Sequence, residues 1–182
     1  DIDEEMYRKI VENRSVKDKD AKDTAKIVGL SAIKYGDLSN QATKDYIFDV
    51  DRFTSFEGNT GPYILYTIVR IKSILNRYVQ EGGDLSTGKI LPAVNASEKN
   101  LMLQLSGFAA MVENAFEEKA PHKICAYIYE VSNAFNSFYH ETKILSEEDQ
   151  AQKESFLQLL QLTRRVLETS IDLLGFSAPD RM

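Results

Sequence analysis

Apolar residues recur every three or four positions along most of the 182 residues, which is the spacing of one buried face on an α-helix. The predicted helices cover residues 1–13, 16–40 and 62–80, then one capped by Ser97, one from Pro121 and a long one from Ser146. Their expected buried positions are Met6, Ile10, Ala21, Ala25, Val28, Ala32, Tyr35, Ile64, Ile68, Ile71, Leu75, Tyr78, Leu101, Leu105, Phe108, Val112, Phe116, Ile124, Ile128, Val131, Phe135, Phe138, Phe156, Leu160, Leu167 and Leu174. We therefore expect an all-α fold, a helical bundle preceded by a helical linker segment.

Short polar signals indicate where these helices start and stop. Thr60 followed by Pro62 has the form of an N-cap with a first-turn proline. The run SEED from Ser146 has the form of a capping box, and Gly175 is placed to end the last helix. Residues 43–58 lose the helical period, which predicts either a short extended segment or a buried loop.

The composition is that of one ordinary soluble domain, with 43% hydrophobic and 27% charged residues and a formal net charge of −6. No apolar run approaches the roughly 20 residues that span a bilayer, so we expect no membrane partner. The single cysteine, Cys125, excludes an internal disulfide and favours a reducing, cytoplasmic location. Because the sequence begins with Asp1 rather than Met, we expect a piece of a longer protein.

Candidate catalytic and metal-binding motifs are sparse. His122 and Cys125 are one helical turn apart and could supply two metal ligands, but no second His/Cys pair completes a site. A surface histidine near a buried cysteine is the favoured alternative. The segment GNTG at 58–61 is too short for a phosphate-binding loop and lacks the lysine that would follow. We therefore expect no metal or cofactor site in this sequence.

The segment 62–80 stands out in this acidic chain because its three charged residues are all basic. On a helical wheel with about 100° per residue, Thr67, Arg70 and Arg77 fall within about 40° of Tyr63. Arginine matches the geometry of phosphate, and an exposed tyrosine can stack on an unpaired base. The alternative, a half-buried tyrosine with two ordinary surface arginines, is favoured by spacing alone. The acidic net charge also argues against nucleic acid.

Three stretches, in order along the chain, resemble one known family. They are YGDLSNQATKDYIFDVDRFTSFEGNTGPYILYTIVRIKSI, of which FEGNTGPY is the most specific part, then AYIYEVSNAFNSFYHETKIL and finally LLGFSAPDRM. The family is that of the arginyl-tRNA synthetases. In that family, the first stretch resembles the passage from the catalytic domain into the anticodon-binding bundle, the second a later bundle helix and the third the C-terminus. The resemblance covers nearly the whole sequence and implies that the partner is an arginine-specific tRNA.

The resemblance also implies two regions with different roles. Residues 1–58 would be the helical link from the catalytic domain, and residues 59–182 the anticodon-binding bundle. The parent would be an ATP-dependent arginine–tRNA ligase. The ATP-binding signatures of the His-Ile-Gly-His and Lys-Met-Ser-Lys-Ser types are absent from this sequence. ATP and magnesium would therefore be handled in the catalytic domain, and this chain alone would be inactive.

Several positions match family residues that approach the anticodon loop. They are Gly58, Asn59, Gly61, Tyr63, Thr67, Tyr139, Lys143 and Met182, to which the wheel adds Arg70 and Arg77. Gly58 and Gly61 would let the backbone come close to nucleotides. Lys143 stands where some family members carry an aromatic residue. Met182 would fold back against the start of the 62–80 helix, whereas the alternative for the tail is a disordered end. A different class of function, a helical protein–protein adaptor with no nucleic-acid role, is favoured by the acidic net charge.

Overall fold

The structure is a computed structural model that describes residues 2–12 and 18–182, and these residues form eight helices and no β-strand. The helices are α1 (Ile2–Glu12), α2 (Asp18–Leu38), α3 (Val50–Phe53), α4 (Gly61–Gln80), α5 (Ala96–Ser106), α6 (Phe108–Glu117), α7 (Pro121–Glu141) and α8 (Gln150–Leu173). The prediction of an all-α fold is confirmed. No helix in the described ranges is both long and apolar enough to cross a membrane.

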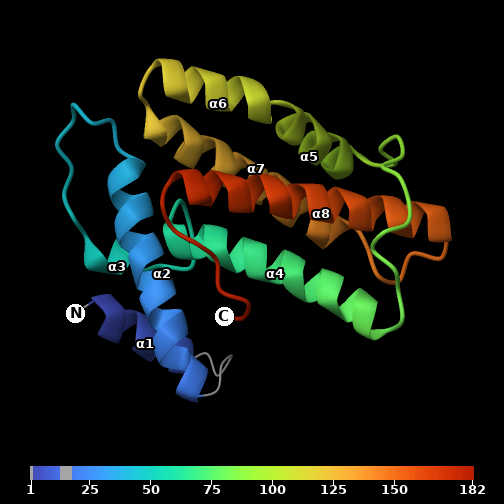
Figure 1. Ribbon diagram of the computed structural model, residues 1–182, viewed down its shortest axis with the longest axis horizontal. Helices are drawn as coiled ribbons and strands as arrows, with labels where there is room; N and C mark the ends of the chain where they lie inside the picture. Colours follow the sequence, from blue (N-terminus) through green and yellow to red (C-terminus); the bar gives the residue numbers. More distant parts are fainter. Residues whose placement is uncertain (1, 13–17) are drawn as a thin grey trace.

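The helices form a long bundle with a smaller helical group at one end (Figure 1). α4, α7, α8 and the α5–α6 pair run along the long axis, and α2 crosses near the start of α4. One hydrophobic core joins both parts, because residues of α1 and α2 are buried in the same cluster as those of α4, α7 and α8. The predicted buried positions that are confirmed are Met6, Ile10, Ala21, Ala25, Val28, Ala32, Tyr35, Ile64, Ile68, Ile71, Leu75, Leu101, Leu105, Ile128, Val131, Phe135, Phe138, Phe156, Leu160, Leu167 and Leu174. Those that are only half-buried are Tyr78, Phe108, Val112 and Ile124.

α2 meets the first turn of α4 at very short range. A Cβ on Gly61 would lie 2.3 Å from the carbonyl oxygen of Ser31, so only glycine lets the two backbones come this close. Gly61 is itself buried in this contact. The missing side chain of Gly61 therefore serves helix packing, and the approach of its backbone to nucleotides stays a prediction.

The single helix predicted after Ser97 is divided into α5 and α6 at Gly107. The amide of Gly107 donates to the carbonyl of Gln104, only three residues back, and this tighter turn separates the two helices. Beyond Leu105 the stripe is less deeply buried, since Phe108 and Val112 are half-buried. Phe116 is 83% exposed, so the prediction that it is buried is wrong.

Two helix caps differ from those predicted. The N-cap of α5 is Asn95, whose side-chain oxygen accepts from the amide of Glu98, whereas Ser97 lies inside the helix. The N-cap of α8 is Asp149, and Ser146 lies before it. In both places the sequence offers two suitable cap residues within a few positions.

Residues 43–58 form neither of the two predicted structures. They contain the one-turn helix α3 and no strand. The stretch before α3 is exposed rather than buried, with Ile47 at 87%. Phe53 anchors the segment, because its ring lies against Gly36 of α2, where a Cβ would come within 2.8 Å of it.

Gly175 occupies the C′ position just after α8, as predicted. Gly175 has a φ of 79°, the left-handed conformation that glycine adopts without steric cost. Its amide bonds the carbonyl of Asp172, and the amide of Phe176 bonds the carbonyl of Ile171. This pair of bonds closes the helix and turns the chain into the C-terminal tail.

Candidate nucleic-acid interface

The turn before α4 sets the position of the first residues of that helix. Gly58 has a φ of 78°, and a Cβ there would meet no atom within 4 Å. Asn59 is exposed, and its side-chain oxygen lies 2.5 Å from the hydroxyl of Tyr35 in α2. The hydroxyl of Thr60 accepts from the amide of Tyr63, which confirms the predicted N-cap. Gly58 is thus the predicted backbone position that faces open space.

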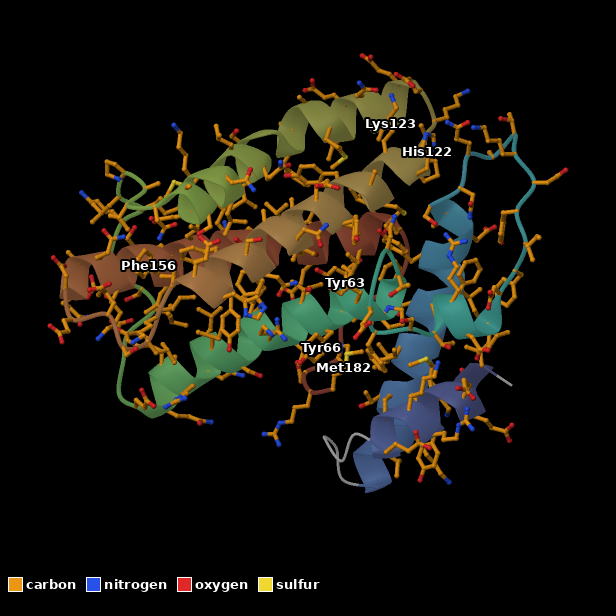
Figure 2. The ribbon with its side chains drawn as sticks, turned by 180° about the vertical axis from the view of Figure 1, so that it is seen from behind. Tyr63, Tyr66, His122, Lys123, Phe156 and Met182 are labelled. Carbon is orange, nitrogen blue, oxygen red and sulfur yellow. The ribbon has the colours of Figure 1, made fainter. Side chains whose placement is uncertain are left out.

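Tyr63 is half-buried between α4 and α7 (Figure 2), as the alternative to an exposed stacking platform predicted. Its hydroxyl donates to the side-chain oxygen of Asn133 at 2.8 Å and accepts from the side-chain amide of Asn136 at 2.9 Å. Its ring meets Tyr129 edge to face, with 5.8 Å between the centroids. Burial raises the pKa of the phenol, so the hydroxyl is neutral at physiological pH. Tyr63 is therefore held in one orientation with part of its surface exposed.

Thr67, predicted on the same exposed flank, is fully buried. Its hydroxyl donates to the carbonyl of Tyr63, and the side-chain nitrogen of Asn136 lies 3.4 Å from the same hydroxyl. Thr67 therefore supports Tyr63 and Asn136 from the buried side of α4. This placement corrects the prediction that Thr67 itself contacts a ligand.

Arg70 is held in place by neutral groups. Its guanidinium donates to the side-chain oxygen of Asn136 at 2.8 Å and to the hydroxyl of Tyr66 at 3.1 Å. It also lies over the rings of Tyr66 and Tyr139, at 4.7 and 5.1 Å from their centroids. Among the described residues, no carboxylate forms an ion pair with Arg70. The guanidinium of Arg70 therefore has a fixed orientation, and no carboxylate of the described residues neutralises its positive charge.

A groove of about 520 Å³ runs from this cluster along α4 and the segment that follows α7. Arg70, Arg77, Tyr139 and Lys143 line the groove, so four predicted contact residues share one concave surface. Tyr139 is 37% exposed there. Arg77 differs from Arg70 in that Glu81 neutralises it at 2.9 Å. The groove offers cations and one aromatic face to a ligand.

The C-terminal tail packs along another flank of α4. The ammonium of Lys72 donates to the carbonyl of Pro179 at 3.3 Å and pairs with Asp180 at 3.5 Å. Met182 is half-buried against the core and lies near Tyr66 in the view of Figure 2. The prediction of a docked tail is confirmed. Its anchor is in the middle of α4 rather than at the start.

The structure gives no support to a metal site at His122 and Cys125. Cys125 is buried, and burial raises the pKa of its thiol to about 12. The thiolate that metals prefer is therefore disfavoured. In the ranges 2–12 and 18–182, no three His, Cys, Asp or Glu side chains lie close enough together to hold a metal ion.

Sequence reasoning missed Tyr66, Asn133 and Asn136. The two asparagines and Tyr139 are three residues apart on α7, and this spacing on one helix face was an available signal. No pattern among neighbouring residues indicated that this face of α7 packs against Tyr63, Thr67 and Arg70 of α4.

Comparisons with known proteins bear directly on this face. The family model of the DALR anticodon binding domain matches residues 64–182, more than half of the chain. The chain belongs to the DALR anticodon binding domain family. Apart from Tyr63 and the turn before it, the whole interface lies within the DALR domain. Membership of this family gives no support to the adaptor alternative.

Three proteins similar to this DALR-domain chain are named for the same enzyme. An arginine–tRNA ligase of Agathobacter rectalis is 65% identical over 190 residues, which cover 100% of this chain and 32% of the relative. One of Alkaliphilus oremlandii is 51% identical over 181 residues and is covered to 31%. The arginyl-tRNA synthetase of Thermus thermophilus has the same fold, with a TM-score of 0.86 and 30% identity over 100% of this chain and 32% of that one. The chain thus spans about a third of the length of these relatives.

Proposed function

We propose that this chain is the anticodon-binding part of an arginine–tRNA ligase, an enzyme that joins arginine to its tRNA with ATP. The observation that carries the proposal is Arg70, a fixed and uncompensated cation between two tyrosine rings on the DALR domain. Phosphates are bound by such cations, and unpaired bases stack on such rings. The relatives' shared name supports arginine as the amino acid.

In this proposal the anticodon loop lies along the α4–α7 face. Arg70 and Lys143 meet phosphates, and the exposed face of Tyr139 stacks on an unpaired base. Arg77 lines the same groove, but it contributes less because Glu81 already neutralises it. The exposed part of Tyr63 continues this surface toward the start of α4. The residues that extend it at its edges are Gly58, Asn59 and, on the tail side, Met182.

We further infer that residues 1–58 link the bundle to a catalytic domain and that residues 59–182 form the anticodon-binding bundle. The tight contact between α2 and α4 supports a link that is packed on the bundle. We assign ATP and magnesium to the catalytic domain, because GNTG in this chain lacks the lysine that follows a phosphate-binding loop. Their chemistry belongs to the rest of the enzyme. A cytoplasmic location suits tRNA as the partner.

The test is the binding of arginine-specific tRNA by the full-length protein at several salt concentrations. We expect the logarithm of the association constant to fall linearly with the logarithm of the salt concentration, because bound phosphates release counterions. We also expect the protein to charge this tRNA with arginine. Binding that ignores salt, or no binding at all, would sink the proposal.

A further inference from the structure

Asn136 lies at the centre of the polar cluster between α4 and α7. We propose that Asn136 is a positioning residue that aims Arg70 at bound RNA and leaves the charge of Arg70 uncompensated. This inference rests on the proposed function, because it concerns how the α4–α7 face meets tRNA.

The neighbours of Asn136 decide the orientation of its amide. Arg70 has only donors, so the Asn136 atom 2.8 Å from the guanidinium is the oxygen. The nitrogen then faces the hydroxyls of Tyr63 at 2.9 Å and Thr67 at 3.4 Å. A flipped amide would set two donors against each other at Arg70. One side chain of α7 thus fixes both the aromatic and the cationic residue of α4.

The arginines that are paired with carboxylates show what is different about Arg70. Arg77 bonds Glu81 at 2.9 Å, and Arg164 bonds Glu168 at 3.0 Å. Each of these pairs joins residues four apart along the chain and neutralises the cation. Arg70 is instead bonded across two helices, and its partners are an amide and a phenol.

Asparagine, rather than aspartate, is the side chain that suits this arrangement. A carboxylate at position 136 would have nearly the same shape and would bond Arg70 more strongly. It would also cancel the charge that a phosphate needs. The amide holds Arg70 in one direction, with the rings of Tyr66 and Tyr139 on its faces, before RNA arrives. That order lowers the entropic cost of binding.

The test is Asn136→Asp in the full-length protein, with Asn100→Asp as the matched control. Asn100 is exposed on α5, so its substitution adds the same charge on a helix outside the cluster. Dissociation constants for arginine-specific tRNA are measured over a range of salt, together with the melting temperature. For Asn136→Asp we expect at least about tenfold weaker binding, and a salt slope smaller by about 0.7, the contribution of one phosphate of a single strand. Asn136→Asp loses the donor that faces Tyr63 and Thr67 but bonds Arg70 more strongly, so its melting temperature should stay within a few degrees of wild type. Asn100→Asp should bind within about twofold of wild type with the wild-type slope.

A second background separates positioning from a general effect. In Arg70→Ala, no cation remains to be neutralised, so adding Asn136→Asp should change affinity by less than about twofold. An equal loss in both backgrounds would overturn the inference, and so would a wild-type salt slope or a fall in melting temperature that accounts for the lost binding. If any of these contrary results is found while wild-type protein binds tRNA with the expected slope, the inference about Asn136 is wrong but the proposed function stands. If wild-type protein shows no salt-dependent binding, the proposed function fails and the inference with it.

Discussion

Arg70 and Lys72 are two cations on α4, two residues apart, and the molecule treats them in opposite ways. The side chain of Lys72 is 11% exposed and lies 3.3 Å from the carboxylate of Glu168 and 3.5 Å from that of Asp180. Arg70 bonds only neutral groups and lines a groove. Residues two apart on a helix face different directions. Lys72 therefore holds the tail through its carboxylate and carbonyl partners. Arg70 has neutral partners and keeps a positive charge that a ligand could meet.

The largest effect should come from Lys72→Ala. It removes a mostly buried stem and the cation that joins α8 to the tail, while Glu168 keeps Arg164 as a partner. We therefore expect the free energy of unfolding to fall by about 2 kcal/mol, chiefly through the lost packing of the stem. Denaturant unfolding measures this loss. Lys72→Met, which keeps the stem, should recover most of it. A wild-type unfolding curve for Lys72→Ala would mean that the tail flank contributes nothing to stability.

Arg70→Ala should act on binding instead. Removing Arg70 leaves no carboxylate of the described residues without a cation, so we expect the free energy of unfolding to fall by less than about 1 kcal/mol. We expect tRNA binding to become at least tenfold weaker. Arg77→Ala is the matched control, since Arg77 lies on the same flank but is already paired with Glu81. It should weaken binding by less than about threefold. Equal effects of the two substitutions would contradict the distinction between open and neutralised cations.

Deleting Arg181 and Met182 asks whether the tail flank shares in binding. The contacts of Lys72 with Pro179 and Asp180 remain, so helix content by circular dichroism should not change. If Met182 extends the binding surface, affinity for tRNA should fall by about tenfold, or roughly 1.4 kcal/mol. Wild-type affinity at matched salt would confine binding to the α4–α7 flank.

The smallest effect is expected for Tyr63→Phe. This change removes the hydroxyl between Asn133 and Asn136 and should cost about 1 kcal/mol of stability. Affinity should fall by only about threefold, because Arg70 keeps its own bond to Asn136. Calorimetric melting and tRNA titration measure the two effects. A loss in affinity larger than that of Arg70→Ala would show that the aromatic residue, not the cation, carries the binding.

Features encoded by neighbouring residues could be predicted from the sequence. Thr60 caps α4 as expected, because an N-cap bond spans only three residues. Gly175 ends α8 for a similarly local reason, its left-handed φ. Spacing singled out Arg70, and the family resemblance singled out Tyr139 and Lys143. All three line one groove, and their contact with tRNA stays a prediction.

Features that depend on contacts between distant segments could not be predicted. Thr67 and Tyr63 lie on one flank of α4, but packing against α7 buries the first fully and the second by half. Asn136 lies more than 60 residues from its partners on α4 along the chain, so no local pattern indicates its role. Phe116 has the spacing of a core residue and becomes exposed because the helix is divided before it.

The contact between Gly61 and Ser31 has a mechanical consequence. The backbones of α2 and α4 are in direct contact there, with no side chain between them that could change rotamer when one helix moves. Tyr63 follows one half-turn later on the same helix. A spectroscopic label on α2 should therefore respond when tRNA binds at α4. A displacement of α2 would therefore move the first turn of α4, and a ligand that displaced Tyr63 would move α2 in turn.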